Sequence, residues 1–339
     1  MDPHISVIVT AYNRKKYLPD ALRSLERQTL ARDEFEVIVV KNFEDQASDE
    51  IIRRNGWRWI YSGEKAQGPF ILAGLEESRG EIITFLEDDD MYAPERLQVI
   101  EKAFREIEGL AYFHNEQVII DSDGKVIGDA EAGPDVMIED PAKYCKQLFL
   151  DPGGFHNLSS IAVSARIVDI LGMALRGASA SADLVIMTIA AVAGQRMLLS
   201  GKRLTMWRVH GNSRSAYAYA VKEGEWRDAV AHLAWIYDIR AAAAAYVLEL
   251  LGKHPCRPYA EHLELVRRLE ASATPDWALQ KRPKSSPLDF LRALHLRLSR
   301  KMEGGLGLMA VLAVDSVISK APNQVRETWW RLRWRLGHR

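Results

Sequence analysis

The chain has 339 residues, of which 47% are hydrophobic and 27% are charged, and its net charge is −1. These values are typical of a globular protein and leave room for one large α/β domain with an appendage. The two cysteines, Cys145 and Cys256, are too few for a disulfide framework, so we expect both to be reduced thiols. No apolar stretch reaches the ~18 residues of a spanning helix, and the first residues lack the basic and apolar regions of a secretory signal, so we expect neither feature.

Short apolar or aromatic runs predict four strands before residue 90, with helical patterns between them. The strands are expected at residues 5–10, 35–40, 57–61 and 81–86, and the helices at residues 19–30, 48–54 and 69–78. This regular alternation indicates a doubly wound, mostly parallel, Rossmann-like sheet. Sheets of this kind bind ligands at the carboxyl ends of their strands.

The second half of the chain changes from mixed structure to helix. The expected elements are a helix at 94–108, a strand at 110–120, a turn at 121–124, a Gly-rich loop at 151–154, a strand at 159–163, a helix at 183–193 and strands at 197–199 and 205–209. Beyond Tyr217 the pattern is almost wholly helical, and the clearest linker is at 281–287. We therefore expect an α/β domain at 1–217, a helical region at 218–280 and a basic helical tail at 281–339.

Four consecutive acids, Glu87, Asp88, Asp89 and Asp90, directly follow the fourth predicted strand. Carboxylates packed together near the end of a sheet repel one another, and a divalent cation removes that penalty. Mg²⁺ and Mn²⁺ prefer such oxygen ligands, together with phosphate oxygens and water. The alternative is a solvated acidic turn in which Asp90 caps the next helix.

Four segments of the chain resemble, in order, segments of the inverting family-2 glycosyltransferases with the GT-A fold. Residues 5–13, ISVIVTAYN, are similar to that family's opening strand and loop. Residues 80–97, GEIITFLEDDDMYAPERL, resemble its metal-binding DxD segment. Residues 181–184, SADL, resemble the segment of the catalytic base, and residues 206–215, MWRVHGNSRS, the late histidine segment. The resemblance implies a GT-A domain followed by an α-helical C-terminal extension.

The resemblance also implies roles for individual residues. Two registers fit the DxD motif, Glu87-x-Asp89 and Asp88-x-Asp90, and we favour the second. Asp88 and Asp89 would then contact the nucleotide-sugar, and Asp90 would bind Mn²⁺ or Mg²⁺. His210 would be a further metal ligand or would meet the diphosphate; otherwise it is a loop histidine.

Asp183 would be the general base that takes the proton from the acceptor hydroxyl, unless it only caps a helix. The remaining residues implied in nucleotide-sugar binding are Thr10, Ala11, Tyr12, Arg14 and Asn42.

The chain departs from the family where the second strand ends, because the family usually has an aspartate there that reads the base. Lys41 or Asn42 occupies that position, and Asp45 follows if the loop is longer. The amide of Asn42 can hydrogen-bond a base edge, so the donor could be GDP-mannose or a UDP-hexose. The implied reaction is an inverting displacement at the anomeric carbon. The alternatives are a nucleotidyltransferase-like enzyme, disfavoured by the absence of a Gly-rich basic loop after the first strand, or a non-catalytic nucleotide-sugar-binding protein.

The predicted tail is basic, since residues 281–339 hold 13 lysines and arginines but 4 aspartates and glutamates. Tryptophan and arginine together on amphipathic helices favour an anionic membrane surface, so we expect a cytoplasmic protein peripheral on the inner face of the cell membrane. The acceptor would then be a lipid-linked glycan or a polyprenyl phosphate. The alternative is a helical subdomain packed on the core or an oligomer interface. We expect no nucleic-acid partner.

Overall fold

The computed structural model describes residues 3–129, 133–150, 157–210, 226–274, 285, 287–299 and 306–337. The predicted Gly-rich loop at 151–154, most of the predicted linker at 281–287 and the predicted boundary at 217/218 lie outside these residues. The chain divides into two compact units, Met1–Arg208 and Val209–Arg339. Each unit is described separately.

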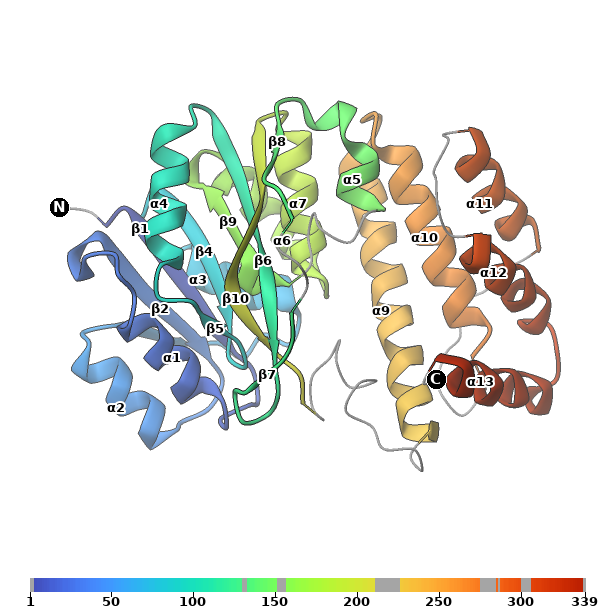
Figure 1. The fold of residues 1–339 in the computed structure, drawn as a ribbon, viewed down its shortest axis with the longest axis horizontal. Helices are drawn as coiled ribbons and strands as arrows, with labels where there is room; N and C mark the ends of the chain where they lie inside the picture. Colours follow the sequence, from blue (N-terminus) through green and yellow to red (C-terminus); the bar gives the residue numbers. More distant parts are fainter. Residues whose placement is uncertain are drawn as a thin grey trace. The chain divides into compact units, whose positions relative to one another are not determined.

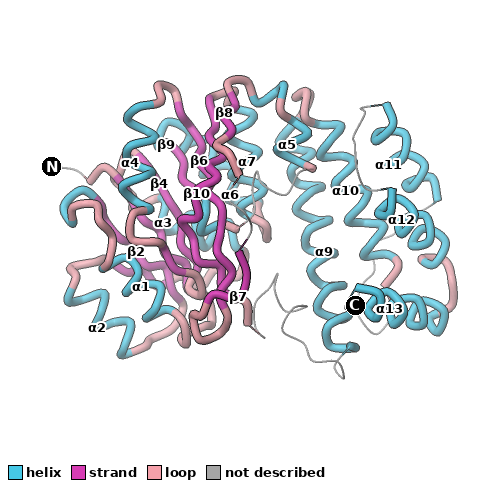
Figure 2. The backbone as a smooth tube through the Cα atoms, viewed as in Figure 1, coloured by secondary structure: helices cyan, strands magenta, loops and turns pink. Residues whose placement is uncertain are grey.

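The first unit is built on one mixed sheet with the strand order β3-β2-β1-β4-β9-β6-β10-β5 (Figures 1 and 2). Two further strands lie off this path: β7 pairs with β6, and β8 pairs with β10. Strands β3, β2, β1 and β4 are parallel, as are β6 and β10, whereas β9 runs antiparallel between β4 and β6. The strands are β1 Ile5–Ala11, β2 Phe35–Lys41, β3 Arg58–Tyr61, β4 Ile82–Glu87, β5 Met91–Tyr92, β6 Leu110–Ile120, β7 Val126–Asp129, β8 Val136–Ile138, β9 Ile161–Ser164 and β10 Arg196–Arg208.

Helices cover both faces of this sheet, because the central strands are apolar on both sides. Alternate residues of β1 point to opposite faces: Val7 and Val9 join the core that includes α1, α2 and α4, whereas Ile8 meets α3. Gly74 permits this close approach of α3, since a Cβ there would lie 2.6 Å from Cγ2 of Ile8. The helices are α1 Leu18–Glu26, α2 Gln46–Arg54, α3 Gln67–Leu75, α4 Arg96–Glu106, α5 Cys145–Phe149, α6 Val168–Gly177 and α7 Ala182–Val192. The predicted doubly wound α/β fold is confirmed.

Strand β10 differs from the prediction, which placed two separate strands at 197–199 and 205–209. The break expected near Gly201 is instead an irregularity inside one strand, with register shifts against β6 on both sides of Arg203. The carboxylate of Asp135 accepts hydrogen bonds from the Ser200 hydroxyl (2.8 Å) and the Gly201 N–H (2.9 Å) and so satisfies the backbone where the ladder is interrupted.

The second unit is helical in the residues described, with α9 Trp226–Leu251, α10 Arg257–Ser272, α11 Pro287–Ser299, α12 Leu306–Ile318 and α13 Asn323–Gly337. Two tryptophans of α13 hydrogen-bond inside the unit. The indole N–H of Trp329 donates to the buried Asp315 of α12 (2.7 Å), and that of Trp330 donates to the Ala273 carbonyl (3.0 Å). These two side chains therefore serve packing within the unit.

The structure bears on the expected state of the two cysteines and on the expected absence of a spanning helix. The expectation of two reduced cysteines is wrong, because neither Cys145 nor Cys256 is a free thiol and each is disulfide-bonded. Nothing in the sequence around either cysteine indicated this. Among the described residues, none of the helices has both the length and the apolar character to cross a bilayer.

Candidate active site

The acid cluster lies where the neighbouring parallel strands β1 and β4 end. Thr10, near the end of β1, is paired with Glu87, the last residue of β4. The backbone N–H of Asp88 donates to the Thr10 carbonyl at 3.0 Å, so the two strand ends are joined directly. This is the edge at which doubly wound sheets bind ligands.

All three aspartates of the cluster are buried, with Asp88 2%, Asp89 8% and Asp90 2% exposed. The alternative of a solvated acidic turn is therefore wrong. Asp90 does not cap the next helix either, because α4 begins after Glu95 with no side-chain cap. Buried carboxylates need compensating partners, and the structure provides two sets of them.

The first partner is Arg14, whose guanidinium lies between two of the aspartates. Its Nε donates to Oδ2 of Asp88 at 3.2 Å, its Nη2 contacts Oδ1 of the same carboxylate, and its Nη1 lies 2.6 Å from Oδ2 of Asp89. The preceding residue, Asn13, has a left-handed backbone (φ 56°) that turns the loop after β1. Arg14 thus uses its planar fork on both carboxylates at once.

The second set of partners surrounds Asp90. Its Oδ2 accepts hydrogen bonds from Nδ2 of Asn157 (3.0 Å) and the hydroxyl of Ser159 (2.7 Å), and its Oδ1 accepts one from the backbone N–H of Arg208 (3.0 Å). None of these three residues was predicted from sequence. Arg208 gave one signal, because it falls within the strand predicted at 205–209, and an arginine that a sheet buries needs partners there.

The ionised carboxylates of the site remain unfavourable despite these partners. Burial raises the pKa of Asp88 to about 7; Arg14 opposes this, while Asp89 and Asp90 add to it. Burial also raises the pKa of Asp90 well above its ordinary value, with further contributions from Asp89 and Glu87. Burial lowers the pKa of Arg14, but Asp89 and Asp88 more than offset this and raise it overall. An additional cation would therefore be stabilised at this position.

Strand β2 ends beside this site with Lys41, but the lysine side chain is directed elsewhere. Lys41 is buried, its ammonium contacts the Asp49 carboxylate, and it lies 4.6 Å from the centre of the Trp59 ring. Asp45 is also engaged, because its carboxylate caps α2 by accepting from the Ser48 N–H (3.0 Å). Neither residue is therefore placed to substitute for a base-reading aspartate.

Asn42 instead pairs with the loop that follows β1. Its Oδ1 accepts from the Asn13 N–H, and its Nδ2 donates to Oδ1 of Asn13, both at 2.8 Å. In the same loop Ala11 is buried, Thr10 and Tyr12 are partly exposed, and the Tyr12 ring meets Phe70 edge-on at 5.6 Å. The predicted nucleotide-contact residues of β1 and β2 thus form one continuous strand-end surface.

Asp183 lies in the first turn of α7 and is partly exposed. It accepts a hydrogen bond from the Leu184 N–H (2.8 Å). The residue at the start of the helix is Ser181, which has a left-handed backbone (φ 51°) and no side-chain cap. The Ala182 N–H donates instead to Oε1 of Gln67 in α3 (3.1 Å). Burial, together with the charge of Asp183, raises the pKa of Tyr112 in β6.

Comparison with known proteins identifies the domain that carries this geometry. The family model "Glycosyl transferase family 2" matches residues 6–127, the segment from β1 to the turn after β6. This segment, about a third of the chain, is thus similar to glycosyl transferase family 2.

Individual relatives also carry the name glycosyltransferase, and a solved structure shares the fold. An uncharacterised glycosyltransferase of a Nostoc species is 29% identical over 153 residues, which cover 42% of this chain and 45% of that protein. One from Haemophilus influenzae is 35% identical over 107 residues, covering 29% and 35%. The matches thus span less than half of these relatives. The crystal structure of S. aureus TarS 1–349 in complex with UDP-GlcNAc has a TM-score of 0.58 at 15% identity and covers 98% of this chain and 92% of that one, so the two share a fold.

The acid cluster fits a divalent cation shared with a ligand. Among the described parts of the chain, no three His, Cys, Asp or Glu side chains converge as a metal site of their own. Mg²⁺ usually uses only one or two carboxylates and completes its shell with substrate phosphate and water. The other predicted ligand, His210, belongs to the second unit and is 5% exposed. Asp88 to Asp90 supply three buried carboxylates beside the Arg14 guanidinium. The donor set therefore suits a cation held jointly with a diphosphate.

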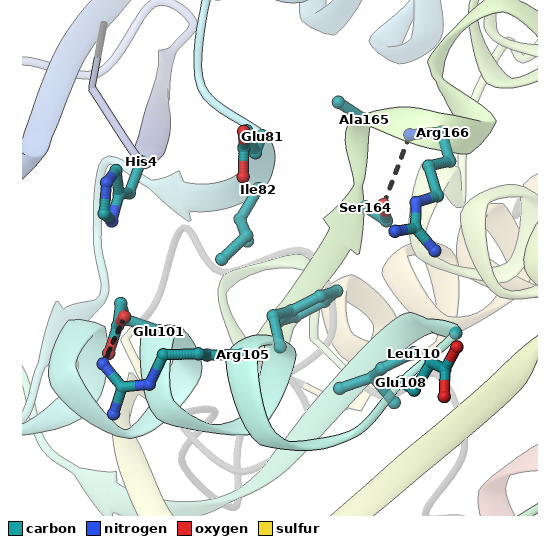
Figure 3. Close-up of a pocket in the computed structure, with 12 residues that line it drawn as sticks. His4, Glu81, Ile82, Glu101, Arg105, Glu108, Leu110, Ser164, Ala165 and Arg166 are labelled. Carbon is teal, nitrogen blue, oxygen red and sulfur yellow. Dashed lines mark hydrogen bonds and ion pairs between the residues drawn. The ribbon is translucent and has the colours of Figure 1, made fainter. Parts of the chain in front are cut away.

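A hollow of about 590 Å³ lies at the other end of strand β4 (Figure 3). His4 and Ile82, where β1 and β4 begin, line it together with Arg105, Glu108 and Arg166. Because it is at the amino ends of the parallel strands, it is separate from the acid cluster, and we assign it no part in the site.

Proposed function

We propose that this protein transfers a hexose from a nucleotide-sugar to an acceptor hydroxyl or phosphate, with inversion at the anomeric carbon and with the help of Mn²⁺ or Mg²⁺. The observation that carries the proposal is the buried cluster Asp88–Asp90 at the carboxyl ends of adjoining parallel strands, where burial and neighbouring carboxylates raise the pKa of Asp88 and Asp90. A cation bound to a diphosphate would stabilise the ionised form of these carboxylates.

The strand-end surface formed by Thr10, Ala11, Tyr12 and Asn42 would receive the nucleotide. The amide of Asn42 is held by Asn13 and still offers a donor hydrogen and an acceptor lone pair to a base edge. An amide can pair with uracil or with guanine, so UDP-hexoses and GDP-mannose are both donors to test. The TarS structure contains UDP-GlcNAc, and a fold of this kind therefore has room for a UDP-sugar.

The chain's own residues would position the reactants and handle the proton. Asp183 would accept the proton of the acceptor hydroxyl as that oxygen attacks the anomeric carbon opposite the departing diphosphate. Asp88 and Asp89 would orient the nucleotide-sugar, and Asp90 and His210 would hold the cation. A bound Mn²⁺ or Mg²⁺ supplies electrostatic stabilisation of the negative charge on the leaving diphosphate. Catalysis then depends mainly on positioning and electrostatics.

We further propose that the acceptor is lipid-linked and that the helical unit meets an anionic membrane surface on the cytoplasmic side. Large apolar side chains are exposed on each of its last three helices: Leu288 (72%) on α11, Val317 (67%) on α12 and Leu332 (49%) on α13. The segment that carries them is basic, which complements anionic lipid. Apolar and basic groups together are typical of interfacial binding.

A thermal-shift experiment with UDP, GDP and Mn²⁺, alone and in combination, tests the proposed function. We expect a nucleoside diphosphate to stabilise the protein only when Mn²⁺ is present, by roughly 2.7 kcal/mol at 100 times Kd, and EDTA to remove the effect. A screen of nucleotide-sugars for Mn²⁺-dependent hydrolysis then separates an enzyme from a silent binder. No shift with any combination of these ligands would refute the proposal, and a shift without hydrolysis or transfer of any donor would favour a binding protein.

A further inference from the structure

The position of Arg14 bears on when a cation can enter the site. The arginine side chain is 25% exposed, whereas the carboxylate of Asp88 is 3% and that of Asp89 12% exposed. One guanidinium therefore lies between two buried carboxylates that directly precede Asp90, the cation ligand proposed above. A cation at Asp90 must either displace the guanidinium or bind next to it.

Binding next to it is unfavourable in the absence of other charges. A divalent ion within about 5 Å of a guanidinium is repelled by more than 1 kcal/mol even at the dielectric constant of water, and burial strengthens the repulsion. A diphosphate changes this balance, since its oxygens are ligands for the cation and are also acceptors for the fork of an arginine. Arg14 can then leave the carboxylates without losing a charged partner.

We propose that Arg14 couples the binding of the cation to that of the nucleoside diphosphate: without the diphosphate it occupies the carboxylates and keeps the cation affinity low, and with the diphosphate it releases them. This inference rests on the metal-dependent function proposed above. Arg14 is thus a positioning residue, and its effect can be measured as a change in Mn²⁺ affinity without any measurement of activity.

The loop around Arg14 supports this role, because its backbone is held in place while the Arg14 side chain extends from the loop to the carboxylates of Asp88 and Asp89. The two hydrogen bonds between Asn13 and Asn42 anchor the loop to β2, and the bond from Asp88 N–H to the Thr10 carbonyl anchors the acid cluster to β1. Exchange of partners therefore requires only rotation of the arginine side chain.

The test measures Mn²⁺ binding to the full chain by the electron paramagnetic resonance signal of free Mn²⁺, with and without UDP or GDP. In the wild type we expect weak binding of Mn²⁺ alone and much tighter binding with the diphosphate that the thermal-shift experiment selects. Arg14→Gln should bind Mn²⁺ alone about ten-fold more tightly or better, and the enhancement by diphosphate should fall by at least that factor. Arg14→Lys, which keeps the charge, should bind Mn²⁺ alone as weakly as the wild type.

The matched control is Arg54→Gln, which removes the same charge from an exposed ion pair with Glu26 (2.8 Å). It should leave Mn²⁺ binding unchanged, and melting curves establish that all variants are folded. Unchanged or weaker binding of Mn²⁺ alone to Arg14→Gln, while the wild type binds Mn²⁺ with diphosphate, overturns the coupling and leaves the proposed function standing. If no form binds Mn²⁺ with either diphosphate, both proposals are wrong.

Discussion

The backbone N–H of Arg208 lies 3.0 Å from Oδ1 of Asp90 and joins the last long strand of the sheet to the acid cluster across 118 residues of sequence. The side chain of Arg208 adds further links. Its Nε donates to the Asp89 carbonyl (2.8 Å), and its guanidinium lies 4.6 Å from the Tyr17 ring and 3.3 Å from Asp20 in α1. The cluster is thus held from β10 and α1 as well as from its own strand.

Arg208→Met should destabilise the protein, because it leaves the carbonyl oxygens that accept from the buried guanidinium without this donor. We expect the free energy of unfolding to fall by about 2–4 kcal/mol. Arg196→Met is the control, since Arg196 lies in the same strand but is exposed and pairs with Glu139 (2.6 Å) at the surface. Urea denaturation followed by circular dichroism measures both. Equal midpoints for the two variants would show that the buried contacts of Arg208 contribute nothing to stability.

The strands near the N-terminus were predictable because their signal is local. Residues 5–10 and 81–86 are rich in apolar and β-branched side chains, and such runs form strands covered on both faces. The position of the acids at the end of β4 followed directly from that pattern. The α/β fold and the candidate site could therefore be located from sequence before any long-range contact was known.

The partners of the acids could not be predicted, because they arise from distant segments. Arg14 was expected to contact the nucleotide, and nothing in its neighbourhood indicated that its fork would join Asp88 and Asp89. The same holds for Asn157, which reaches Asp90 from beyond β4. We expected a metal ion to offset the repulsion between these carboxylates, and in the structure the Arg14 guanidinium offsets part of it. The local hydrophobic pattern of a segment predicts which of its side chains are buried, but it does not predict which distant side chains they contact.

Asp183→Asn should abolish sugar transfer and leave nucleotide binding intact. The amide keeps the shape of the carboxylate and its hydrogen bond from the Leu184 N–H, but it cannot accept a proton. We expect kcat to fall by about 10²–10⁴-fold, measured with the donor that the hydrolysis screen identifies, and Kd for the diphosphate to change by less than about two-fold. Asp169→Asn, at the start of α6, serves as the control. Retained turnover in Asp183→Asn would remove this residue from the mechanism.

Asn42 and Lys41 are adjacent in sequence but should differ in their effect on nucleotide binding. Lys41→Met keeps an apolar stem against Trp59 and leaves Asp49, 24% exposed, able to reach water, so we expect unchanged affinity for the diphosphate. Asn42→Ala removes both hydrogen bonds to Asn13 and the amide that would meet the base, and we expect about five- to ten-fold weaker binding, the value of one lost hydrogen bond. Isothermal titration with Mn²⁺ and UDP or GDP measures both, and the opposite ranking would assign the base contact to Lys41.

The exposed apolar residues of the helical unit should contribute to membrane binding, whereas equally exposed residues of the α/β unit should not. Val317 on α12 and Met173 on α6 are both 67% exposed, so Val317→Asp and Met173→Asp form a matched pair. On vesicles rich in phosphatidylglycerol we expect Val317→Asp to lower the partition coefficient about ten-fold, through lost apolar burial and repulsion by anionic lipid. Met173→Asp should leave it unchanged, and neutral vesicles should bind both variants and the wild type weakly. Equal binding of the two variants to anionic vesicles would show that the membrane contact does not include Val317. If the wild type does not bind anionic vesicles, the membrane proposal is wrong and the exposed face of α12 binds a different partner.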